Sequence, residues 1–215
     1  MPEGTDLFEI MQTTRAMRRL KPDPVPDELI RKILHAGVCA ANGGNTQRWR
    51  FLVVKDRKIK QAVQVYYKRA FDEVIGPRYK SSTPPPGVTR ERYDRQHSAV
   101  EYLTDHFHEA PVWIVACMDD GTATPTRGSG ASIYPAVQNM LLTARALGLG
   151  ATLTTRHLMF EKESEAAGAP QRRPAGHLDN QLRRSGSEPA QPRPWRRALP
   201  LEGLGRRQPR QGHGP

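Results

Sequence analysis

The first 163 residues of the chain predict one domain in which helices and strands alternate along the sequence. Apolar residues recur at helical spacing in several stretches, which is the main signal for helices. Two shorter apolar runs, residues 51–54 and 112–118, have the composition of strands, and the second is typical of a strand buried on both faces. With 215 residues in all, the chain is long enough for one sizeable domain.

The expected helices have recognisable first and last residues. Asp6, Asp27 and Asp56 can each accept hydrogen bonds from the free backbone N–H groups of a first helical turn. Gly148 is placed to end the longest helix, because glycine readily adopts the left-handed conformation found after a last turn. The helices are expected at about residues 6–14, 27–38, 58–74, 98–109 and 132–147.

Prolines and glycines mark the segments between these elements. Residues 21–26 hold three prolines, which block a helix and favour an extended linker. Residues 76–96 are polar and contain prolines, and a loop of this length inside a domain is usually a lid, a binding loop or disordered. Residues 150–155 predict a further short strand.

Charge is distributed unevenly along the chain. The net charge of +11 would normally favour a polyanionic partner, but residues 164–215 hold 10 Arg against 4 Asp/Glu. The same 52 residues contain 8 Pro and 7 Gly and no Val, Ile, Phe, Tyr or Met, so they cannot bury enough apolar surface to offset chain entropy. We therefore expect a disordered tail from residue 164. A nucleic-acid role for it is disfavoured, since Trp195 is its one aromatic residue and it offers no stacking platform.

The two cysteines and the hydropathy pattern indicate a cytoplasmic protein. Cys39 and Cys117 each lie in an apolar stretch and are expected to be reduced core residues rather than a disulfide pair. No apolar run approaches the length of a transmembrane helix, and the acidic N-terminus predicts no signal peptide. We predict neither membrane association nor a metal site.

The loop from Asn42 to Trp49 is the first candidate binding segment. Asn42, Asn45 and Gln47 offer paired donors and acceptors suited to the edge of a flat heterocycle, and Gly43 lets the backbone approach a ligand closely. A polar helix-to-strand turn, with Trp49 filling the core, is the alternative interpretation.

A basic cluster near the N-terminus is the second candidate. Arg15, Arg18 and Arg19 lie close together after a helix, where guanidinium groups can bind a phosphate in a bidentate manner. A solvated basic turn is the alternative interpretation of the same residues.

Taken together, four stretches resemble the nitroreductase family of FMN-dependent flavoproteins. The resemblance covers roughly residues 5–163 and implies an α+β fold with a central, mostly antiparallel sheet flanked by helices, in an intertwined homodimer. The four stretches are 15–26, 42–49, the apolar run before Met118, and 136–151.

In such proteins FMN lies at the dimer interface, and the resemblance assigns roles to named residues here. Arg15 and Arg18, with Arg19, are expected at the phosphate and ribityl chain. Residues of the polar loop contact the ring system and ribityl groups, and backbone N–H groups after the Gly148 turn lie at the reactive flavin edge. The cofactor-binding residues so implied are Arg15, Arg18, Arg19, Asn42, Gly43, Asn45, Gln47, Leu153, Thr154 and Thr155.

The resemblance also implies the reaction. NAD(P)H reduces the flavin, and a small-molecule acceptor such as a nitroaromatic or quinone then takes the electrons, so the protein needs no nucleophile of its own. Reductive dehalogenation and flavin breakdown on the same fold are the alternatives, with nucleic-acid binding through the tail as a third. Residues 76–96 are expected to influence the choice of acceptor.

The chain departs from the family pattern at both ends. Thr14 and Ala16 stand where many relatives have Arg and Ser, and no counterpart of the relatives' last core strand and basic phosphate contact can be recognised after Glu163. Our hypothesis is that residues from about 164 are an out-of-frame reading of a GC-rich gene, which translation of the other two frames of the coding DNA would test. As written, the chain is expected to retain flavin weakly or not at all.

Overall fold

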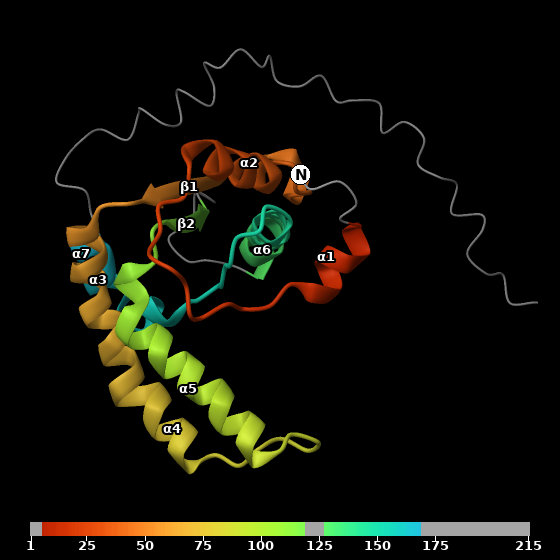
Figure 1. The fold of residues 1–215 in the computed structure, drawn as a ribbon. Coiled ribbons are helices and arrows are strands. Elements are labelled where there is room, and N and C mark those ends of the chain that lie inside the picture. The colour runs from red at the N-terminus through yellow and green to blue at the C-terminus, as the bar shows by residue number, and fades with distance from the viewer. Residues whose placement is uncertain (1–5, 119–126, 169–215) are drawn as a thin grey trace, which may run out of the picture. The chain divides into compact units, whose positions relative to one another are not determined.

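The computed structural model describes residues 6–118 and 127–168. The described elements form seven helices and two strands (Figure 1), with short helical turns between them. The helices are α1 Leu7–Thr13, α2 Asp27–Val38, α3 Arg57–Ala70, α4 Gly76–Ser81, α5 Arg90–His106, α6 Arg127–Ala146 and α7 Glu161–Gly168. The strands are β1 Trp49–Val54 and β2 Trp113–Met118, and the turns η1 to η4 are Gly43–Asn45, Phe71–Ile75, Phe107–Glu109 and Arg156–Phe160.

The two predicted strands pair with each other. β1 and β2 are antiparallel, in a register that places Trp49 opposite Met118 and Val54 opposite Trp113. Phe51 and Val53 face the helical core, whereas Leu52 between them is 46% exposed. One face of this sheet is therefore packed and the other is open within the described residues, as expected for an antiparallel pair.

Two predictions about strands are wrong. Residues 150–155 form no strand, because Ala151 makes only an isolated parallel bridge with Ala16 and no other described segment pairs with these residues. β2 is not buried on both faces, since its side chains are half-buried and Cys117 is exposed. Cys39 is also exposed, so both thiols are free, as expected, but neither is a core residue.

The core lies between α2 and α6, which run beside the sheet (Figure 1). In each of these two helices, the apolar side that the sequence predicts is the side that is buried. Close approach of the two helices depends on Gly37, since a Cβ there would lie 3.1 Å from Met140 Cγ and 3.2 Å from Met140 Sδ. The buried side chains of this cluster are Ile30, Ile33, Leu34, Val137, Met140 and Ala144.

The segment predicted as a long loop, residues 76–96, is mostly helical, and that prediction is wrong. The π-helical turn η2 continues α3 directly into α4, and Thr89 caps α5 by accepting a hydrogen bond from the Arg92 N–H. The loop is thus confined to residues 82–89. His97 joins the two arms, because its ring stacks on Tyr79 at 3.9 Å and meets Tyr93 edge-on at 3.9 Å. We call residues 57–106, from α3 to α5, the helical hairpin.

The tail is expected to begin at residue 164, but residues 164–168 belong to α7, and residues from 169 onward lie outside the described part of the chain. The tail and its out-of-frame origin therefore stay predictions. Among the described residues, no helix combines the length and apolar character needed to cross a bilayer.

Replacing Gly37 tests the α2–α6 contact. We expect Gly37→Val to lower the free energy of unfolding by about 1–3 kcal/mol, because the added methyl groups overlap Met140 in a packed core. Urea unfolding followed by circular dichroism measures the change. Arg31→Val is the matched control, since it adds a branched side chain on the exposed side of the same helix. Equal midpoints for both variants would contradict the close contact.

Candidate functional site

The polar loop after α2 has an unusual backbone. Gly44, Asn45 and Gln47 have φ of 60°, 52° and 51°, in the left-handed region that residues other than glycine seldom adopt. The Asn42 side-chain oxygen accepts a 2.9 Å hydrogen bond from the Gln47 N–H, and the Gln47 side chain donates to Asn45 Oδ1 at 3.3 Å. Backbone strain of this kind concentrates at ligand-binding positions, so the geometry favours the binding interpretation of the loop.

The same loop is fixed to the core at two points. Trp49 is only 6% exposed and packs with Ala40 and Ala136. The Gly43 N–H donates a 3.1 Å hydrogen bond to the Ser132 hydroxyl, which ties the loop to α6. Trp49 is thus a core residue, as the alternative interpretation has it. The side-chain amide groups of Asn45 and Gln47 in the same loop are nevertheless exposed.

The three arginines of the basic cluster each contact a different part of the chain. Arg15 donates to the carbonyl groups of Gln12 and Thr14, at 2.7 and 3.1 Å. Arg18 donates to the Ala16 carbonyl at 3.3 Å, and Arg19 stacks over the Tyr102 ring of α5 at 4.3 Å. The three side chains therefore have different contacts, and Ala16 between Arg15 and Arg18 bridges to Ala151.

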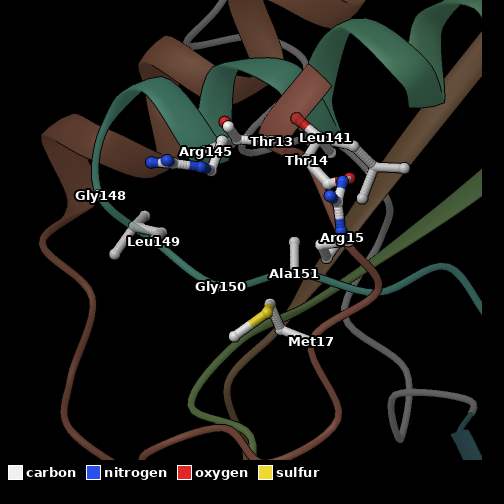
Figure 2. A pocket seen from close by; sticks show the side chains of 10 residues that line it. All are labelled: Thr13, Thr14, Arg15, Met17, Leu141, Arg145, Gly148, Leu149, Gly150 and Ala151. Atoms are coloured by element: carbon white, nitrogen blue, oxygen red, sulfur yellow. Dashed lines mark hydrogen bonds between the residues drawn. The ribbon is translucent and has the colours of Figure 1, made fainter. Parts of the chain in front are cut away.

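A pocket of about 350 Å³ lies between the segment after α1 and the end of α6 (Figure 2). It brings Arg15 next to the Gly148–Ala151 turn, two of the predicted segments, and adds Arg145 from the last turn of α6. We did not predict Arg145 from the sequence, because an arginine in the last turn of a helix looks like an ordinary polar residue. The lining residues are Thr13, Thr14, Arg15, Met17, Leu141, Arg145, Gly148, Leu149, Gly150 and Ala151.

The segment after the pocket carries three consecutive backbone donors. Within the described residues, the N–H groups of Leu153, Thr154 and Thr155 have no hydrogen-bond partner. Leu153 is 49% exposed, whereas Thr154 turns toward α3, where its hydroxyl lies 3.1 Å from the Tyr67 hydroxyl. Adjacent free N–H groups can bind an electron-rich ligand edge. The structure therefore leaves the predicted backbone donors available and assigns the Thr154 side chain to anchoring.

Arg156 attaches this segment to the helical hairpin. Its guanidinium lies 4.6 Å from the Tyr67 ring centroid and 5.2 Å from that of Phe71, and it donates to the hydroxyl of the fully buried Thr104. Contacts of a cation with aromatic rings at such distances stabilise by about 0.5–2 kcal/mol. Burial lowers the pKa of the neighbouring His157, so that imidazole is neutral near pH 7 and Arg156 carries the positive charge there.

The predicted binding segments occupy opposite ends of α6. Ser132 contacts the polar loop, whereas Arg145 lines the pocket with Arg15. At 1.5 Å per helical residue, Ser132 and Arg145 are about 20 Å apart along the axis. Within one chain, the polar loop and Arg15 therefore lie too far apart to bind the same small group.

Comparison with known proteins places the chain in a family. Residues 11–178 match the Nitroreductase family. A Methanothermobacter thermautotrophicus protein whose name reads NADH dehydrogenase/NAD(P)H nitroreductase is 27% identical over 149 residues, 69% of this chain and 60% of that protein. The NADH dehydrogenase of Thermus thermophilus is 44% identical over 109 residues, 40% of this chain and 49% of that protein.

A solved structure shows the same fold. Iodotyrosine deiodinase bound to FMN and 3-iodo-L-tyrosine superimposes with a TM-score of 0.59 at 23% identity, covering 77% of this chain and 83% of that one. The chain thus belongs to the Nitroreductase family, since the family match spans most of its length. The predicted α+β, nitroreductase-like fold is confirmed. The chain spans about half to three fifths of the length of the two relatives named above.

A double-mutant cycle tests the Tyr67–Thr154 contact. Tyr67→Phe and Thr154→Val each remove one hydroxyl and keep the shape of the side chain, so each is expected to lower the free energy of unfolding by about 0.5–1.5 kcal/mol. The double variant should lose less than the sum, because the two hydroxyl groups are each other's partners. Urea unfolding measures all three variants. Strictly additive losses would show that the contact is not formed.

Proposed function

We propose that this chain binds FMN and, as a homodimer, passes electrons from NAD(P)H through the flavin to a small-molecule acceptor. Membership of the Nitroreductase family is the observation that carries the proposal. The M. thermautotrophicus relative is named for NAD(P)H chemistry, and the superimposed deiodinase holds FMN. A nitroaromatic or a quinone is the acceptor class we favour.

The donor groups on the chain fit the parts of FMN. Arg15 and Arg18 supply cations for the phosphate, and the amide groups of the polar loop suit the polar edge of the ring system. The free N–H groups of residues 153–155 suit the edge of the ring that becomes electron-rich on reduction. When bound, FMN supplies the hydride and electron chemistry, and the chain supplies orientation and electrostatics.

A site shared between two copies of the chain accounts for the distance between the two binding segments at the ends of α6. Because the polar loop and Arg15 are about 20 Å apart along α6 in one chain, we propose that each site uses the polar loop of one subunit and Arg15 of the other. Exposed apolar side chains on α1 support an interface of this kind: Leu7 is 56%, Phe8 67% and Met11 50% exposed. Residues this apolar are usually covered in the working assembly.

Flavin titration and a redox assay test the function. We expect FMN to bind saturably but weakly, with partial loss during purification, and NAD(P)H oxidation to depend on added FMN. Fluorescence quenching measures binding, and absorbance at the nicotinamide band measures turnover with a nitroaromatic, a quinone or an iodinated phenol as acceptor. Absence of saturable FMN binding would refute the function, whereas stoichiometric flavin through every column would refute only the weak retention.

Subunit mixing tests the shared site. Arg15→Gln and Gln47→Ala should each impair flavin binding alone, but a refolded 1:1 mixture should regain about a quarter of the sites, because half of the dimers then contain one intact site of two. A mixture of Arg15→Gln with Arg18→Gln is the control, since both changes lie in the same segment and leave no intact site. Equal behaviour of the two mixtures would show that each site lies within one subunit.

A further inference from the structure

Arg145 is a cation in a pocket that holds no acidic side chain. The ten lining residues include two arginines, Arg15 and Arg145, and neither an Asp nor a Glu. Arg145 is half-buried, and in the described part of the chain its side chain makes no hydrogen bond or ion pair. Lys55, Lys68 and Arg69, by contrast, pair with carboxylates. A guanidinium without a counter-charge at a pocket is available to an anionic ligand.

The location of Arg145 in the last turn of α6 offers a simpler explanation. Cations stabilise helix C-termini by interacting with the last carbonyl groups. Here three of the last four carbonyls already have partners: the Leu147, Gly148 and Leu149 N–H groups donate to the carbonyls of Thr143, Arg145 and Ala144, at 3.0, 3.0 and 2.8 Å. Most of these carbonyls therefore do not depend on the guanidinium, and Figure 2 shows Arg145 on the side of Leu149, across the pocket from Arg15.

We propose that Arg145 is a further phosphate-binding residue, which acts with Arg15 on the phosphate monoester of FMN. This inference rests on the proposed function and extends it to a residue outside the predicted set. The pocket lies beside the Gly148–Ala151 turn, which leads directly into the free backbone donors of residues 153–155. A flavin whose ring edge meets those donors can extend its chain toward the pocket.

The two arginines are the lining side chains with donors to spare. The hydroxyl groups of Thr13 and Thr14 donate to the carbonyls of Glu9 and Ile10, so they are engaged within α1. Arg15 spends part of its donor capacity on nearby carbonyls, whereas all the side-chain donors of Arg145 are open within the described residues. Guanidinium groups bind phosphate with two parallel hydrogen bonds, which favours arginine over lysine in this role.

Riboflavin, which lacks the phosphate, provides the discriminating measurement. We expect Arg145→Gln to raise the Kd for FMN by about 10–100-fold, the loss typical of a charged hydrogen bond, and to leave the Kd for riboflavin unchanged. Arg31→Gln, which removes an exposed arginine from α2, is the control and should change neither Kd. Fluorescence quenching of both flavins gives the four comparisons.

Three results would overturn the proposal. An unchanged FMN Kd would show that Arg145 does not touch the phosphate. Equal losses for FMN and riboflavin would show a structural role. A change confined to the KM for NADPH, without one for NADH, would assign the pocket to the phosphate of the dinucleotide.

Failure of the proposed function would be distinguishable from failure of this inference. If the wild-type chain binds neither flavin, the function is refuted, and inorganic phosphate then probes the pocket by itself. Phosphate should raise the thermal midpoint of the wild-type chain more than chloride at equal ionic strength does, and Arg145→Gln should abolish the difference. No difference in the wild-type chain would refute the anion pocket too.

Discussion

The packing of α2 against α6 at Gly37 is the contact on which the rest of the structure depends. Met140 lies so close to the Gly37 backbone that no larger residue fits without displacing it. This contact holds α6 against the sheet, and α6 in turn carries a binding segment at each end. The separation of those segments is therefore a property of helix length, which side-chain motion cannot alter.

The helical hairpin is connected to the segment after α6 by aromatic and hydroxyl contacts. Tyr67 is fully buried, stacks on Phe107 at 4.0 Å and meets the Thr154 hydroxyl, while Arg156 spans from Tyr67 to Thr104 on α5. A shift of α3 or α5 would thus displace residues 153–155. Since the π-helical turn at Phe71 begins beside Arg156, the hairpin has a natural point of bending next to the proposed reactive edge.

Local sequence patterns predict the elements whose signals are local. Apolar spacing predicts α2 and α6, Asp56 caps α3 through the N–H groups of Lys58 and Ile59, and Gly148 adopts the left-handed conformation, with φ of 76°. The hairpin was missed for an equally local reason. Prolines near residue 84 suggested a loop, but they occupy only the short turn between two helices, and the π-helical turn carries the chain past Gly76 without a break.

The site could be predicted only residue by residue, because its arrangement depends on contacts distant in sequence. Arg15, Arg18 and Arg19 are neighbours in the chain, yet Arg19 stacks on Tyr102 of α5 whereas Arg15 and Arg18 bind nearby carbonyls. The sequence predicts Thr154 as a ligand contact, but in the structure its hydroxyl forms a hydrogen bond with that of Tyr67, 87 residues away. Arg145 gives no sequence signal at all, since only the fold brings the end of α6 beside Arg15.

The shared site that we propose accommodates both the strain in the polar loop and its distance from Arg15. The left-handed backbone of Asn45 and Gln47 is maintained by hydrogen bonds internal to the loop, so nothing else in the described chain requires that conformation. The side-chain amide groups of Asn45 and Gln47 are exposed. A self-associating chain places such a loop against the opposite end of a second α6, and a two-fold axis produces that exchange twice. The loop, the exposed apolar side of α1 and the length of α6 then have a single explanation in a site shared between two copies.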